Sequence, residues 1–104
     1  MAGNIYVAEF SQAFVDTSGA IQMATVPPLA EYTVASGATS AAFNAATRYI
    51  RVNVDSGFTS PAAAQIEIGA SPSIVAGSMR LAINQTEYFR VQAGYKIACG
   101  TVAA

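Results

Sequence analysis

The stretch TRYIRVNVD, residues 47–55, decides the fold because its apolar and polar side chains alternate. One face of the stretch carries Ile50, Val52 and Val54 together with Arg48. The other face carries polar and aromatic residues: Thr47, Tyr49, Arg51 and Asn53. A period of two residues is typical of a β-strand that buries one face and exposes the other. We therefore predict a half-buried strand over residues 47–54.

Similar short segments, separated by turn-forming residues, recur along the whole chain. The turn signals are Ser18-Gly19, Pro27-Pro28, Ser36-Gly37, Ser56-Gly57, Ser71-Pro72, Ala76-Gly77, Asn84-Gln85 and Ala93-Gly94. Between them we predict strands at residues 5–10, 20–25, 29–35, 40–43, 47–54, 64–69, 78–83, 87–91 and 95–102. Eight or nine short strands at this spacing are typical of an all-β sandwich or barrel.

The alternation within these segments favours antiparallel sheets. In AQIEIG, Ala64, Ile66 and Ile68 oppose Gln65 and Glu67. In SMRLAI, the apolar set Met79, Leu81 and Ile83 opposes the set Ser78, Arg80 and Ala82. Parallel sheets covered by helices would show unbroken apolar runs instead. We predict two antiparallel sheets packed face to face about 10 Å apart.

The segment ATSAAFNAAT, residues 38–47, is the main challenge to this interpretation because its alanines suit a helix. Its serine, threonine and asparagine side chains compete with helix by bonding to the backbone. We predict a brief strand with Phe43 facing inward, followed by a turn at residues 44–46. One turn of helix is the alternative.

The 104 residues fit a single domain, 1–104, whose first 26 residues differ in character. Their apolar side chains follow no consistent period, so residues 1–26 are either an N-terminal arm or the first strand of the sandwich. An arm can add a strand to the exposed sheet edge of a neighbouring subunit. We expect Ile5, Tyr6, Phe10 and Phe14 to contact such a partner.

Charge and composition argue against several classes of function. The five basic residues are scattered along the chain and outnumbered by six acidic ones, which argues against binding to nucleic acid. No apolar run approaches the roughly 20 residues of a membrane helix, and MAGNIYVAEF lacks a basic leader, so we expect synthesis in the cytoplasm.

The sequence carries no catalytic, cofactor-binding or metal-binding motif. Histidine, the commonest general base and metal ligand, does not occur in the chain. The lone Cys99 lies in a predicted strand, and we expect a small buried hydrophobe rather than a reactive thiol. We predict that the protein is not an enzyme.

A weakly charged surface favours association with other proteins. Charged residues make up 11% of the chain and the formal net charge is -1, so little charge repulsion opposes contact between copies or with partners. We expect a homo-oligomer, either a dimer or a trimer.

Residues 30–102 carry a pattern that resembles a known family. The pattern runs from the TRYIRV strand through IGASP and MRL to EYFRV, a glycine and a final KIA strand. It resembles small virion proteins of tailed bacteriophages, including capsid decoration or cement proteins. An FG dipeptide is common in that pattern where Ile68-Gly69 stands here.

The resemblance implies a compact jelly-roll sandwich that binds the major capsid protein on the outside of the shell and stabilises it. It carries no catalytic residues over to this chain. The alternative is a minor tail or head-spike domain that binds a host surface glycan. Such a site needs exposed aromatic side chains on one face, and the candidates are Tyr32, Tyr49, Tyr88 and Tyr95.

Overall fold

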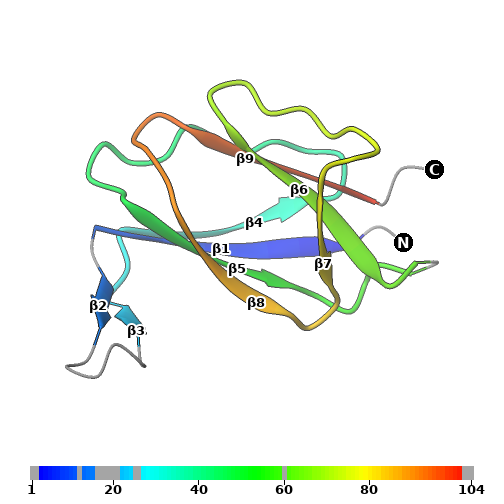
Figure 1. Cartoon of the computed structure of the whole chain (residues 1–104), viewed down its shortest axis with the longest axis horizontal. Coiled ribbons are helices and arrows are strands. Elements are labelled where there is room, and N and C mark those ends of the chain that lie inside the picture. The colour runs from blue at the N-terminus through cyan, green and yellow to red at the C-terminus, as the bar shows by residue number, and fades with distance from the viewer. Residues whose placement is uncertain (1–2, 12, 16–21, 25–26, 60, 102–104) are drawn as a thin grey trace.

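The described part of the chain is all β and is built mainly from two antiparallel sheets (Figure 1). The computed structural model describes residues 3–11, 13–15, 22–24, 27–59 and 61–101, with the backbone alone for 13–15 and 22–24. The strands are β1 (Asn4–Phe10), β2 (Ala13–Val15), β3 (Gln22–Ala24), β4 (Ala30–Ala35), β5 (Tyr49–Val54), β6 (Ala63–Gly69), β7 (Met79–Ala82), β8 (Thr86–Arg90) and β9 (Lys96–Thr101). One sheet has the order β4-β1-β5-β8 and the other β7-β6-β9, while β2 and β3 pair only with each other. The predicted all-β, antiparallel architecture is confirmed.

The four-stranded sheet packs one apolar face against the three-stranded sheet. Ile5 and Val7 of β1 join Ile50, Val52 and Val54 of β5 in the buried core. The alternation predicted for residues 49–54 is therefore confirmed. Thr47 differs from its prediction, because it precedes β5 and is fully buried instead of lying on the wet face with Tyr49.

The three-stranded sheet is covered on both faces, which the alternation of AQIEIG did not predict. Ala64 and Ile66 of β6 lie in the core, but Gln65 on the opposite face is also fully buried. Gln65 donates from Nε2 to the carbonyl of Ala76 at 3.0 Å, and Ile74 lies against Gly100 of β9. The connection between β6 and β7 thus folds over the outer face of this sheet.

Residues 37–43 run antiparallel beside β9 without forming a named strand. The amides of Gly37 and Ser40 donate to the carbonyls of Cys99 and Ile97 at 2.8 Å each, and Thr39 forms an isolated bridge with Ala98. The amide of Ile97 donates to the Ser40 Oγ, so a side chain replaces a backbone acceptor and interrupts the ladder. The strand predicted at residues 40–43 is therefore wrong in detail.

The rest of that prediction holds. Phe43 is buried, and the amide of Thr47 donates to the carbonyl of Asn44 at 2.9 Å across the turn. The helical alternative is wrong, because the segment is extended and its amides bond to β9.

Alternation also fails at the start of β7. Met79 was predicted to face inward with Leu81, but it is 47% exposed, whereas Leu81 is buried. Ser78, predicted to be exposed, is buried and donates from Oγ to Glu67 at 2.7 Å. β7 is an edge strand of four residues, so no further strand flanks Met79 on its outer side.

The N-terminal 26 residues divide into two parts. Residues 4–10 form β1, which lies between β4 and β5 in the four-stranded sheet. Residues 13–15 and 22–24 form a hairpin that projects from the end of the sandwich (Figure 1). β2 was not anticipated, and the predicted turn at 16–19 and the ends of the strand predicted at 20–25 lie outside the described residues.

Cys99 lies in the core, as predicted, with 1% of its surface exposed. Burial, with a smaller contribution from the negative charge of Asp55, raises the pKa of the Cys99 thiol from 9.0 to about 11. The folded state therefore favours the neutral thiol, and the stability that this provides is complete below pH 9 and is lost as the pH rises towards 11.

We predict that ionisation of Cys99 makes the free energy of unfolding about 2 kcal/mol lower at about pH 10.5 than at about pH 8. Urea unfolding of the wild type and of Cys99→Ala measures this, because the tyrosines titrate equally in both proteins. The wild type should lose more stability than the variant over this range. Equal losses, or rapid alkylation of the folded protein at neutral pH, would contradict the assignment.

Candidate functional site

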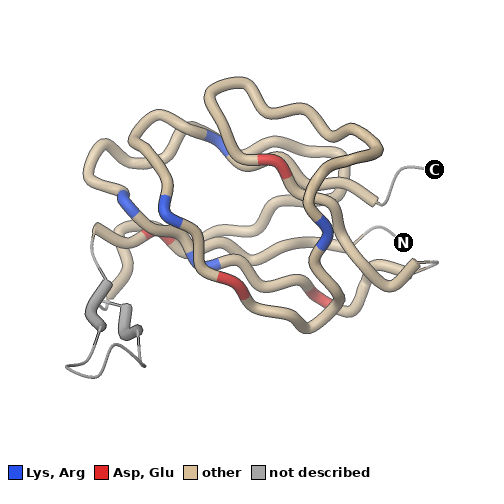
Figure 2. Tube along the Cα trace, in the orientation of Figure 1, with Lys and Arg blue, Asp and Glu red and all other residues tan. Residues whose placement is uncertain are grey.

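Among the described residues most charged side chains lie apart, although Arg48 and Arg90 line one hollow. Arg51, Arg80, Arg90 and Lys96 lie on four different strands of the two sheets. Figure 2 shows basic and acidic positions interspersed along the described chain. A site on this surface must therefore bind its partner mainly through shape, apolar contact and individual hydrogen bonds.

A buried carboxylate, Glu9, lies at one end of the sandwich, where β1, β4 and the turn before β5 meet. Glu9 is 3% exposed. Its Oε2 accepts a hydrogen bond from the Tyr32 hydroxyl at 2.7 Å, and its Oε1 accepts from the Thr47 hydroxyl at 2.6 Å and the Asn44 amide at 2.8 Å. These three donors satisfy a carboxylate that would otherwise be costly to bury.

The phenol of Tyr32 is held neutral by this arrangement. Burial, then the hydrogen bond to Glu9 and its negative charge, raise the pKa of Tyr32 well above its ordinary range. Tyr32 therefore remains a hydrogen-bond donor throughout the physiological range of pH. The hydrogen-bonded pair of Tyr32 and Glu9 positions β4 against β1 and the turn at Asn44. The hydrogen bonds within the cluster occupy both groups, so neither is a free acid or base.

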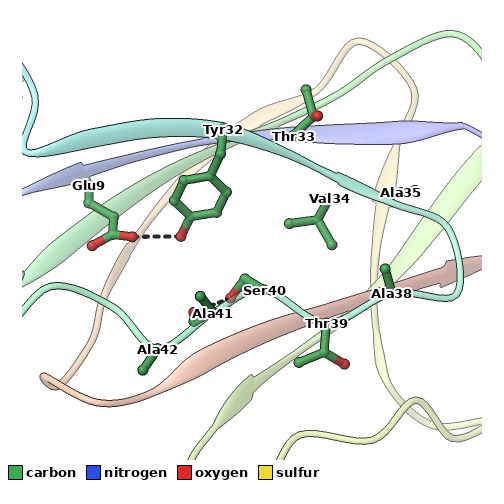
Figure 3. Close-up of a pocket in the computed structure, with 10 residues that line it drawn as sticks. All are labelled: Glu9, Tyr32, Thr33, Val34, Ala35, Ala38, Thr39, Ser40, Ala41 and Ala42. Carbon is green, nitrogen blue, oxygen red and sulfur yellow. Dashed lines mark hydrogen bonds between the residues drawn. The ribbon is translucent and has the colours of Figure 1, made fainter.

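A groove begins at Glu9 and Tyr32 and runs between β4 and residues 38–42 (Figure 3). Its volume is about 450 Å³. Five of its ten lining residues are apolar, namely Val34, Ala35, Ala38, Ala41 and Ala42, and the other five are Glu9, Tyr32, Thr33, Thr39 and Ser40. At one end of the groove the Tyr32 hydroxyl and the Glu9 carboxylate are hydrogen-bonded to each other.

The outer face of the four-stranded sheet is the second candidate surface. Its middle row runs across the strands from Glu31 through Ala8 and Arg51 to Tyr88. Ala8 forms the floor of a hollow with Tyr6, Glu31 and Arg51 around it. Tyr6, at the hollow, and Tyr88, beside Arg51 on β8, are each 45% exposed.

The four residues predicted to contact a partner are dispersed. Ile5 lies in the core, Phe10 is buried at the end of β1, and Tyr6 is exposed on the outer sheet face. Phe14 lies in β2, and its side chain is outside the described residues.

The tyrosines proposed as a platform also divide. Tyr49 and Tyr88 lie on the outer face of the four-stranded sheet, while Tyr32 points to Glu9 and Tyr95 packs against the core. Tyr6 joins the outer face instead.

Sequence reasoning missed the Glu9 cluster, although one signal was present. Residues 5, 7 and 9 lie on the same face of a strand, so the alternation places the Glu9 carboxylate on the buried face with Ile5 and Val7. Thr47 and Tyr32 are remote in the sequence, so only the tertiary fold shows that they supply the required donors.

The His, Cys, Asp and Glu side chains of the described residues form no group of three or more that could hold a metal ion. Among the same residues, no helix has the length and apolarity needed to cross a membrane.

Comparison with models of known protein families, with curated proteins and with solved structures finds no match to the chain.

We predict that Thr47→Val lowers the free energy of unfolding by about 2 kcal/mol, because it removes a hydrogen bond to a buried charge while preserving shape. Thr33→Val is the matched control, since Thr33 is exposed on β4 and should change stability by less than about 0.5 kcal/mol. Urea unfolding of both variants measures the difference. Equal effects would show that Glu9 does not depend on the Thr47 hydroxyl.

Proposed function

We propose that the protein is a non-enzymatic structural protein of a tailed-bacteriophage virion. It binds the major capsid protein on the outside of the shell as a decoration or cement protein. It is made in the host cytoplasm and acts at the capsid surface as a small homo-oligomer. The proposal rests on the sequence pattern of residues 30–102 and on the order in which the strands pair.

The nested order of strand pairing is the observation that carries the proposal. β6 pairs with β7, β5 with β8, residues 37–43 with β9, and β4 with β1. Successive pairs alternate between the two sheets, as in a long hairpin rolled up into a jelly roll. Double-sheet jelly rolls are common in viral capsid proteins, and this analogy supports a role in a virion.

β1 completes this roll from the N-terminal side. It lies between β4 and β5 and pairs with β4, the edge strand of that sheet. The arrangement supports a compact eight-stranded body, with residues 37–43 counted as the eighth strand, and leaves the β2–β3 hairpin outside it.

The surface chemistry suits permanent attachment to a shell. Interspersed charges of low number give little long-range steering, so contact relies on shape and apolar burial. A copy that touches two capsid subunits gains from the high effective concentration of its second contact. Binding to the assembled shell alone then stabilises that shell by mass action.

Particles purified from cells that produce the protein test this proposal. We expect the chain to sediment with capsids at hundreds of copies per particle, as counted by quantitative mass spectrometry, and to remain bound when salt rises about tenfold. A dozen or fewer copies would place the protein in a tail or spike. Release by salt would refute attachment through uncharged contacts.

The outer sheet face favours one second candidate, a tail or head-spike domain that binds a host surface glycan. Tyr6, Tyr49 and Tyr88 lie on this face with Glu31 and Arg51. Aromatic rings can stack on sugar rings while carboxylate and guanidinium groups bond to hydroxyls. The hollow over Ala8 brings Tyr6 together with both charged residues.

For this candidate we predict that Tyr6→Ala weakens glycan binding at least about tenfold, because it removes a central ring at a cost of about 1.4 kcal/mol or more. A glycan array followed by calorimetry on the best ligand measures the effect. Val75→Ala is the control, since Val75 is an exposed hydrophobe of the β6–β7 connection. An array without binding, or equal losses in both variants, would remove the candidate.

A further inference from the structure

The β2–β3 hairpin forms a separate two-stranded sheet in the described chain. β2 and β3 pair over three residues each and join neither sheet. Figure 1 shows the hairpin projecting below the end of the sandwich. A two-stranded hairpin alone is marginally stable at best in water. Its segments, AFV and QMA, are also mainly apolar, so burial against a partner would stabilise it.

The groove between β4 and residues 38–42 has the complementary properties. Half of its lining residues are alanine or valine, and Glu9, its carboxylate, already accepts three hydrogen bonds. An occupant therefore needs no positive charge. The segment from residue 11 to 26 contains one charged residue, Asp16, and three of its apolar residues are large enough to fill spaces between alanines: Phe14, Ile21 and Met23.

The β4 side of the groove also offers free backbone groups. β4 is an edge strand of its sheet. The amide of Ser36 donates to the carbonyl of Gly3, which fixes the alternation of the β1–β4 ladder. Tyr32 and Val34 then bond to β1, while the amides and carbonyls of Glu31 and Thr33 point away from it, toward the free edge. An extended segment can pair there and direct alternate side chains into the groove.

We propose that the β2–β3 hairpin of one copy binds in the groove between β4 and residues 38–42 of a second copy. The hairpin adds a strand to the β4 edge and buries its apolar side chains over Val34, Ala38 and Ala41. An extended chain spans at most about 3.5 Å per residue, so an arm of eight residues reaches about 28 Å. This reach is comparable to the two shorter dimensions of the molecule, which are 27 and 23 Å. The contact joins two different surfaces, so it yields a reciprocal dimer or a ring only where the rotation between neighbouring copies closes, and a filament where it does not.

This inference concerns contacts between copies and does not depend on attachment to a virion. Crosslinking between two differently tagged chains tests it. One chain carries Phe14→Cys and the other Ala41→Cys, both with Cys99→Ala to remove the native thiol. We expect a short bis-maleimide to join the two chains at about tenfold higher yield than in a mixture with Ala82→Cys, an exposed alanine on β7.

A second variant tests the groove without crosslinking. Ala41 is exposed, so Ala41→Phe should fold while filling the groove and blocking the hairpin. We expect sedimentation to show an oligomer for the wild type and for the control Ala82→Phe, and the 10.7 kDa monomer for Ala41→Phe. A monomeric wild type at high micromolar concentration, an unchanged mass for Ala41→Phe, or equal crosslinking with Ala82→Cys would each overturn the proposal.

Discussion

Burial of the Glu9 carboxylate is the constraint on which the arrangement of the sandwich depends. A charge in the protein interior must be satisfied by hydrogen bonds, and here the donors come from β4, from the turn at Asn44 and from Thr47. These bonds fix the path of the chain where it crosses from one sheet to the other. Because residues 37–43 lie just before that turn, their pairing with β9 depends on the same anchor.

The two sheets differ in what covers their outer faces. The β6–β7 connection folds over the three-stranded sheet, where Gln65 is buried and Ile74 lies against Gly100. The outer face of the four-stranded sheet has no such cover from the described connections, and Tyr6 and Tyr88 remain exposed there. The outer face of the three-stranded sheet is therefore covered, with Val75 exposed on the covering connection, whereas the outer face of the four-stranded sheet is open.

Two surfaces are thus available for different purposes. The groove beside β4 combines a partly apolar lining with an unpaired strand edge, which suits an extended segment of another copy. The outer face combines aromatic rings with charges of both signs, which suits a shell protein or a sugar. The two surfaces meet at β4, where Tyr32 and Thr33 line both of them.

The sequence by itself determined the fold class, because the alternation of Ile50, Val52 and Val54 reports directly which face of a strand is buried. It also placed Phe43 and Cys99 inside. The tertiary structure alone decided the burial of Glu9, Thr47 and Gln65, since their partners are remote in the sequence. It also decided that β1 lies within the sandwich and that the hairpin stands apart. Periodicity describes one strand at a time, whereas the cover and hydrogen-bond partners of a polar residue come from elements that only the fold brings to it.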